Sequence, residues 1–355
     1  MSEPDRPTAA ALPQPRDAAR NTSGRAVMIL FGAACLLPVL GDPYKSYITP
    51  PVALAAGVVV ALLGLNGFAR NTGKLAKVLI QISIVLLGLS MDLHEVLRAG
   101  LAGVAFAAGT ILGTFALGIV LGRMLRTGAT LTTLISSGTS ICGGSAIAAT
   151  GPVIGANAAQ MAVATGTVFI LNGIALYIFP PLGTALAMTQ QQFGTWAAVA
   201  IHDISSVVGA ATQFDRTYLA GHPGVDPNHA LEVATAVKLT RTLWIAPVVL
   251  IAAWAFNRWK LGDHAGGKAK VPIPWFIALF VLAAAVRTFW PAVKPVADHA
   301  ADFAKAGMTT ALFLIGAGMS VAAVKQAGWR VMALGVVLWV FISVVAVFVV
   351  RATVT

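Results

Sequence analysis

A run of glycine and hydroxyl residues interrupts an apolar stretch between Ser136 and Ser145. It reads Ser-Ser-Gly-Thr-Ser-Ile-Cys-Gly-Gly-Ser, so three glycines and five hydroxyls fall within ten residues. Irregular backbone at membrane depth is tolerated only where it is enclosed by protein or lines a watery cavity. Small residues also permit close helix packing, but spaced rather than contiguous positions would serve that purpose. The run therefore predicts a broken helix, which secondary transporters use to hold substrate near the midplane.

The composition is that of an all-α polytopic membrane protein. Of the 355 residues, 57% are hydrophobic and only 10% are charged, whereas soluble proteins carry about 25% charged residues. The net charge of +11 comes from short loops rather than one face, so it fits the positive-inside rule better than nucleic-acid binding. Residues 1–24 are polar and are expected to form a disordered cytoplasmic tail, not a signal peptide. Cys35 and Cys142 lie within apolar segments, which argues against a disulfide framework.

Eleven segments approach the roughly 20 apolar residues that a spanning helix needs. They lie near 26–41, 49–66, 74–92, 99–122, 129–150, 157–179, 193–213, 230–256, 272–290, 303–323 and 329–351. The tail and alternate loops, including 180–192 on the same side, hold 15 of the 24 Lys and Arg. This asymmetry predicts a cytoplasmic N-terminus and a periplasmic C-terminus.

An internal repeat is expected, because transporters often duplicate a five-helix unit with inverted topology. Within a transmembrane domain of residues 25–355, the first repeat would cover about 49–179 and the second about 193–351. This register pairs the broken fifth span with the tenth, which carries small and hydroxyl residues. A competing register pairs the third span with the tenth, because Leu-Gly-Leu-Ser-Met at 87–91 resembles Ile-Gly-Ala-Gly-Met at 315–319.

Four ionisable residues lie inside predicted spans, where charge is costly and function is the default hypothesis. His202 and Asp203 are in the seventh span, and Lys238 and Arg241 share one face of the eighth. Two cations on one face need compensating anions, either Asp203, a bound anion or both. A structural ion pair with Asp203 or Glu232 is the alternative. His202 could carry a coupling proton or could be a packing residue, and Asp203 could be a proton site or a counter-ion.

A helix that breaks near Gly143 would point the positive end of the following half-helix at the gap, which suits an anion. Arg241 and Lys238 would bind the charge of that anion. The tenth span would complete the site. The further residues predicted to bind substrate are Gly138, Thr139, Ser140, Cys142, Gly143, Gly144, Ser145, Thr309, Thr310 and Ser320.

Three motifs carry a family resemblance: residues 137–149, residues 202–210 and Val-Lys-Leu-Thr-Arg at 237–241. Together they resemble the YeiH family, also called UPF0324 membrane proteins or candidate sulfate exporters. That family is grouped with the bile acid, arsenite and riboflavin transporter superfamily. The resemblance implies two inverted five-helix repeats, with two broken helices that cross at the substrate site. The extra first helix makes eleven, and residues 140–145 would lie at the crossing.

The sequence thus predicts a secondary transporter of the bacterial inner membrane that moves a sulfate- or sulfonate-like oxyanion by alternating access, with His202 and Asp203 as candidate proton-coupling groups. A passive anion channel and a carrier of organic carboxylates stay open as alternatives. The absence of a Walker motif argues against ATP drive. No enzyme activity, metal or cofactor is expected. The expected partners are a small anion and the bilayer, with a homodimer left open and no nucleic acid.

Overall fold

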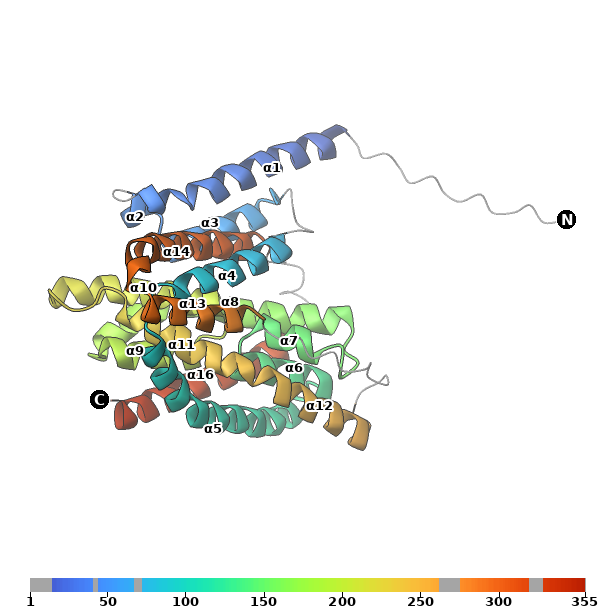
Figure 1. Ribbon diagram of the computed structural model, residues 1–355. Helices are drawn as coiled ribbons and strands as arrows, with labels where there is room; N and C mark the ends of the chain where they lie inside the picture. Colours follow the sequence, from blue (N-terminus) through green and yellow to red (C-terminus); the bar gives the residue numbers. More distant parts are fainter. Residues whose placement is uncertain (1–14, 41–43, 67–71, 262–274, 319–327, 355) are drawn as a thin grey trace.

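The computed structural model describes residues 15–40, 44–66, 72–261, 275–318 and 328–354. Within them the chain is helical (Figure 1). The elements are α1 (Pro15–Ala34), η1 (Leu37–Leu40), α2 (Tyr44–Tyr47), α3 (Pro50–Leu62), α4 (Thr72–Gly88), α5 (Leu93–Leu125), α6 (Ala129–Ser140), α7 (Gly144–Thr150), α8 (Ala158–Ala185), α9 (Gln190–Ala200), α10 (Ile204–Gly221), α11 (His229–Leu243), α12 (Ile245–Trp259), α13 (Trp275–Phe289), η2 (Pro291–Val293), α14 (Lys294–Ala317) and α16 (Gly328–Thr353).

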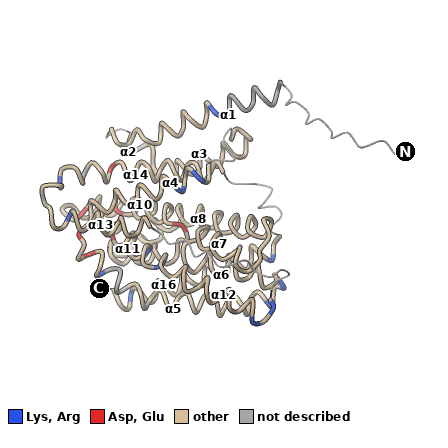
Figure 2. The backbone as a smooth tube through the Cα atoms, turned by 45° about the vertical axis from the view of Figure 1, so that its right-hand side comes forward, with Lys and Arg blue, Asp and Glu red and all other residues tan. Residues whose placement is uncertain are grey.

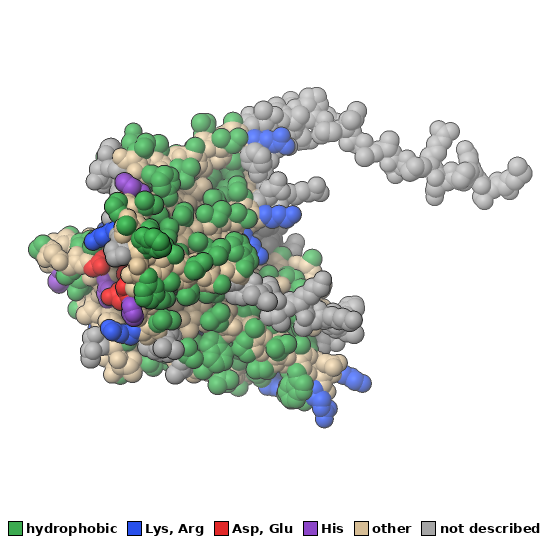
Figure 3. Space-filling model, in the orientation of Figure 1, with side chains coloured by type: hydrophobic (Ala, Val, Ile, Leu, Met, Phe, Trp, Pro, Cys, Tyr) green, Lys and Arg blue, Asp and Glu red, His purple; other side chains and the backbone are tan. Residues whose placement is uncertain are grey.

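Four helical stretches in the described residues are long and apolar enough to cross a bilayer: Phe106–Leu125, Ala158–Ala185, His229–Trp259 and Gly328–Thr353. Shorter apolar helices cover Gly24–Leu40, Pro50–Leu62 and Trp275–Phe289. Large apolar side chains such as Leu112 and Phe348 lie on the surface, and Figure 3 shows hydrophobic side chains across the visible face. An all-helical membrane architecture therefore agrees with the sequence analysis, since lipid is the solvent that such a surface fits.

Residues 129–150 form a helical hairpin. α6 ends at Ser140, the chain turns at residues 141–143, and α7 begins at Gly144. A Cβ added to Gly138 would lie 2.9 Å from Cδ1 of Ile147, whereas continuous helix would separate these positions by about 13 Å. The two limbs therefore lie side by side; we call this pair hairpin 1.

A second hairpin, hairpin 2, is formed by α9 and α10. Phe193 stacks on Phe214 with ring centroids 3.9 Å apart, and Gln190 Nε2 donates to Asp215 Oδ1 at 2.6 Å. A straight helix would hold each of these pairs at least about 30 Å apart. The turn of hairpin 2 lies at residues 201–203, between the end of α9 and the start of α10.

The hairpins overturn the prediction that 129–150 and 193–213 each cross the molecule as single interrupted helices. The physical reason is length: α6 has 12 residues and α9 has 11, enough for about half of the ~30 Å hydrocarbon core. Broken helices that cross are thus replaced by two hairpins that fold back, and two of the eleven predicted crossings are lost.

The connection between α8 and α9 also lies on the other side from the one predicted. Arg351 donates to the Leu186 carbonyl, and Gln192 Nε2 donates to the Val354 carbonyl at 2.9 Å. The loop in 180–192 is therefore beside the C-terminus, not on the opposite side. This loop contains no Lys or Arg. Its composition fits a position beside the C-terminus, because basic residues collect in the loops on the opposite side of the membrane.

The helices form two groups. In the first, the four-helix bundle, α14 packs along α3 and α4, and α13 packs on α4. The second, the hairpin bundle, contains both hairpins with α5, α8, α11, α12 and α16. The two groups meet where α10 contacts α14 and α3, where α13 contacts α5, and where α3 contacts α8. Hairpin 2 thus lies at the boundary between the groups.

Two glycines in the four-helix bundle occupy matching positions. A Cβ on Gly88 of α4 would lie 2.6 Å from the Phe280 carbonyl of α13, and one on Gly316 of α14 would lie 2.5 Å from the Leu54 carbonyl of α3. These are the equivalent glycines in the competing sequence match of 87–91 with 315–319. α4 and α14 run in opposite directions, since Thr72 lies near Gly318 and Ser83 near Gly307.

Candidate functional site

The tips of the two hairpins meet in the interior of the hairpin bundle. Gly143 is at the turn of hairpin 1, with φ +67° and ψ −124°, a conformation that only glycine adopts without strain. A Cβ there would lie 3.4 Å from Cβ of His202, at the turn of hairpin 2. His202 is fully buried. The glycine therefore permits both the turn and the close approach of the tips.

Lys238 joins the two tips. Its Nζ donates to the carbonyl oxygens of Ile141 at 2.9 Å, Ala198 at 3.1 Å and Ile201 at 2.7 Å. These acceptors lie at the carboxyl ends of α6 and α9, where carbonyls lack helical partners and the helix dipole is negative. An ammonium has three N–H donors, so all three are used by the backbone. A fully buried lysine is thus compensated by helix ends.

Arg241 lies one turn further along α11 and contacts hairpin 1. Its Nη1 donates to Oγ1 of Thr110 on α5 at 2.8 Å, and its Nη2 donates to the Ser140 carbonyl. The guanidinium is fully buried, and Nε has no hydrogen-bond partner among the described residues. The planar fork therefore holds the tip, while Nε, which carries one of the five N–H donors, makes no hydrogen bond to the described residues.

Asp203 does not bridge to these cations through hydrogen bonds. Its Oδ2 accepts from the backbone N–H groups of Ser205 at 3.0 Å and Ser206 at 3.3 Å, and from the Ser205 hydroxyl. It is thus the N-cap of α10. Asn172 of α8 supports the same turn, because its Oδ1 accepts from the backbone N–H groups of His202 and Asp203 at 3.0 and 3.2 Å.

Several buried polar atoms around the tips have no hydrogen-bond partner in the described part of the chain. They are Oγ of Ser136, Oγ1 of Thr139, Nδ2 of Asn172, both ring nitrogens of His202 and Nε of Arg241. Asn172 Nδ2 and Arg241 Nε can only donate, whereas the hydroxyls and imidazole can donate or accept. Buried polar atoms are normally satisfied. The donor-only atoms Asn172 Nδ2 and Arg241 Nε therefore call for hydrogen-bond acceptors.

The structure brings together only part of the predicted site. Thr139, Ser140, Cys142 and Gly143 lie at the tip of hairpin 1 with Lys238 and Arg241, and His202 and Asp203 form the tip of hairpin 2. Gly138 packs inside hairpin 1 and Gly144 packs on Phe169, while Ser145 is exposed.

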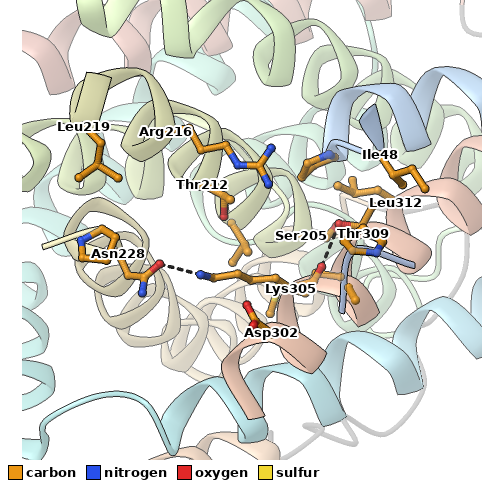
Figure 4. Close-up of a pocket in the computed structure, with 17 residues that line it drawn as sticks. Ile48, Ser205, Thr212, Arg216, Leu219, Asn228, Asp302, Lys305, Thr309 and Leu312 are labelled. Carbon is orange, nitrogen blue, oxygen red and sulfur yellow. Dashed lines mark hydrogen bonds between the residues drawn. The ribbon is translucent and has the colours of Figure 1, made fainter. Parts of the chain in front are cut away.

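The predicted residues of the tenth span lie apart from this cluster. Thr309 and Thr310 donate to the carbonyls of their own helix at Lys305 and Ala306. Thr309 lines a cavity of about 200 Å³ between α3, α10 and α14 (Figure 4). That cavity reaches Ser205, the residue bonded to Asp203. Ser320 lies outside the described residues.

Two supporting residues were not predicted to contact the site. Asn172 lies inside an apolar span, where a lone amide is a signal of a polar neighbour. Thr110 gave no signal, since a threonine in an apolar helix commonly donates to its own backbone, as it also does here to Phe106.

Comparison with known proteins places the chain among membrane proteins. A family model described as conserved hypothetical protein 698 matches residues 43–335. A UPF0324 membrane protein of Porphyromonas gingivalis is 43% identical over 306 residues, which cover 85% of this chain and 87% of the relative. The chain belongs to the UPF0324 family.

Other members of the family are similarly close. A UPF0324 membrane protein of Bacteroides thetaiotaomicron is 42% identical over 302 residues, covering 84% of this chain and 86% of the relative. One from Vibrio parahaemolyticus is 39% identical over 318 residues, covering 89% of this chain and 95% of the relative. No solved structure matches. The family predicted from the three motifs is thereby confirmed, and the names of these relatives state no substrate.

Proposed function

We propose that this protein is a secondary active transporter of a small oxyanion, with sulfate or a sulfonate as the first candidates. The observation that carries the proposal is the junction of two hairpin tips around Lys238 and Arg241, both with 0% exposure. Discontinuous helices that end near the midplane are the architecture in which transporters bind substrate. A charge buried at that depth is costly, so a functional role is the default hypothesis for both residues.

The chemistry of the unpartnered atoms favours an anion. Nε of Arg241 and Nδ2 of Asn172 are donor-only groups without partners, and the hydroxyl of Thr139 can add a third donor. An oxyanion offers several acceptor oxygens to such a set. Arg241 would contact the anion directly. Lys238 would contribute positive charge while its N–H groups hold the tips in place.

Alternating access would move the hairpin bundle against the four-helix bundle. The present arrangement encloses the tips, since His202, Lys238 and Arg241 are all inaccessible, so the anion must reach them through a change at the boundary of the bundles. His202 and Asp203 belong to the turn of hairpin 2, which would move relative to the four-helix bundle. They remain our candidates for coupling to a proton.

We also propose that the chain contains an inverted repeat, in the competing rather than the five-apart register. The matching contacts of Gly88 and Gly316 pair α3 with α13 and α4 with α14. Hairpin 1 would then correspond to hairpin 2, and α8 to α11 with α12. The second repeat would then follow a permuted chain order, and spans five apart would not match.

The charge distribution supports a bacterial inner-membrane location with the N-terminus in the cytoplasm. Basic residues Arg123, Arg126, Arg258 and Lys260 lie at the end where α5 and α12 terminate, and Figure 2 shows positive charge gathered there. Asp92, the N-cap of α5, lies at the opposite end of that helix. The positive-inside rule would make the basic end cytoplasmic.

The test is ligand-induced thermal stabilisation of the purified protein across a panel of sulfate, sulfonates, phosphate and carboxylates. A bound ligand stabilises by RT ln(1 + [L]/Kd), so one anion class should raise the melting temperature of the wild type. Arg241→Gln should abolish the shift, whereas Arg258→Gln, at an exposed position of α12, should keep it. A shift that survives in folded Arg241→Gln would refute the binding role, and a shift with carboxylates alone would replace the substrate class.

A further inference from the structure

The cavity between α3, α10 and α14 opens toward the end of the molecule that carries the C-terminus. Residues near its outer part include Asn228 and Pro227 from the loop before α11, while its inner part reaches Ser205. Ser205 is the residue that bonds Asp203 at the tip of hairpin 2. The cavity therefore leads from the surface to the turn of hairpin 2, along the boundary of the two bundles.

The lining combines two cations with hydroxyl groups. Figure 4 shows Arg216 and Thr212 from α10 opposite Lys305 and Thr309 from α14. Lys305 Nζ donates to Oδ1 of Asn228 at 2.6 Å. The side-chain amide of Asn228 thus accepts through its oxygen, and its nitrogen can only donate. Charged donors from both bundles and the Thr212 hydroxyl of α10 thus face the same space.

Acidic groups also lie near this end. Asp302 is the one carboxylate among the described lining residues, against two cations. Behind the lining, Asp215 and Glu232 both interact electrostatically with Lys305, and Asp215 also accepts from Gln190 and from the backbone N–H groups of Ala230 and Leu231. The side chains that line the cavity thus carry one more positive than negative charge.

The internal match gives the lysine a counterpart. The offset that aligns Gly88 with Gly316 also aligns Lys77 with Lys305 and Gln81 with Thr309. α4 and α14 run in opposite directions, so the counterparts face the other end of the molecule. A lysine followed by a polar residue one turn later is thus present on each of the two matched helices.

We propose that this cavity is the entrance through which the anion reaches the hairpin tips, with Arg216 and Lys305 attracting it and Thr212 binding it in transit. The inference rests on the proposed transport of an oxyanion and adds a second, outer site. A basic funnel concentrates anions and raises their rate of arrival without contributing to the final site.

Cysteine labelling tests the entrance independently of transport. Thr309→Cys is reacted with an anionic and a cationic methanethiosulfonate reagent, and Ala220→Cys, exposed at the end of the same α10, provides the reference ratio. The native cysteines at 35 and 142 are buried, and unsubstituted protein gives the background. The anionic-to-cationic rate ratio at Thr309→Cys should exceed the reference by about fivefold or more. Adding Arg216→Gln should return it toward the reference.

The outcomes separate the two proposals. A ratio at Thr309→Cys equal to or below the reference overturns the entrance even if the protein transports anions. A raised ratio that Arg216→Gln removes supports the entrance, and it does so even if no anion stabilises the protein, in which case the transport proposal fails alone. If Thr309→Cys does not fold, Thr212→Cys carries the same measurement.

In a transport assay, Arg216→Gln should raise KM severalfold and leave kcat unchanged, because the entrance affects the arrival of the anion. A fall in kcat alone would contradict the role of Arg216 at the entrance.

Discussion

Gly143→Ala should uncouple the two hairpin tips. The added Cβ would lie 3.3 Å from Cγ1 of Val168 and 3.4 Å from Cβ of His202, so the tip of hairpin 1 must move by a few tenths of an ångström. Overpacking of this kind costs about 1–3 kcal/mol, and the positive φ of +67° adds backbone strain of about 1–3 kcal/mol. The contact with Val168 of α8 applies whether or not the tips touch, and only the contact with His202 depends on the tips. At the lower end of the overpacking range, about 1 kcal/mol, the His202 contact lowers the population of the closed site by about fivefold.

Gly128→Ala is the matched control, since Gly128 has φ +78° but nothing within 4 Å of an added Cβ. It carries the strain without the tip contact. The assay compares sulfate exchange in proteoliposomes and melting temperature for both variants. Both should lose stability, but only Gly143→Ala should lose exchange, by roughly fivefold. Equal exchange in the two variants would refute the argument that tip contact matters.

Two further perturbations test the packing. Lys238→Met leaves three buried carbonyls without donors, each costing about 1–3 kcal/mol, so its melting temperature should fall well below that of Lys77→Met, whose lysine is exposed; equal melting would show that Lys238 does not brace the tips. Gly88→Ala and Gly316→Ala should both destabilise strongly and by similar amounts, because each Cβ meets a carbonyl within 2.6 Å. Gly109→Ala, with open space around it, should be neutral or gain up to about 1 kcal/mol, and a large difference between the first two glycines would count against the repeat.

The sequence was sufficient to identify the helical membrane class and the position of the first break. The composition requires lipid-exposed helices, and the contiguous small residues at 136–145 cannot form an ordinary spanning helix. The turn of hairpin 1 indeed falls at Gly143. The pairing of Lys238 and Arg241 on one helix face followed from their spacing of three residues, which is a local property.

The folding back of the chain could not be read from these local patterns. A segment of about twenty apolar residues has the same composition whether it crosses once or returns halfway. What distinguishes the hairpins are tertiary contacts, such as Phe193 on Phe214. Likewise, a buried lysine suggests an anionic partner, and only the three-dimensional arrangement of the tips reveals that backbone carbonyls accept from Lys238.

The most direct measurement is radiolabelled sulfate counterflow in liposomes that contain the purified protein and are loaded with one competing anion at a time. The account predicts saturable uptake that depends on the internal anion, is lost in Arg241→Gln and is kept in Arg258→Gln. Uptake that persists in folded Arg241→Gln, or the absence of uptake with every oxyanion and carboxylate tried, would contradict the claim that the hairpin tips carry an anion.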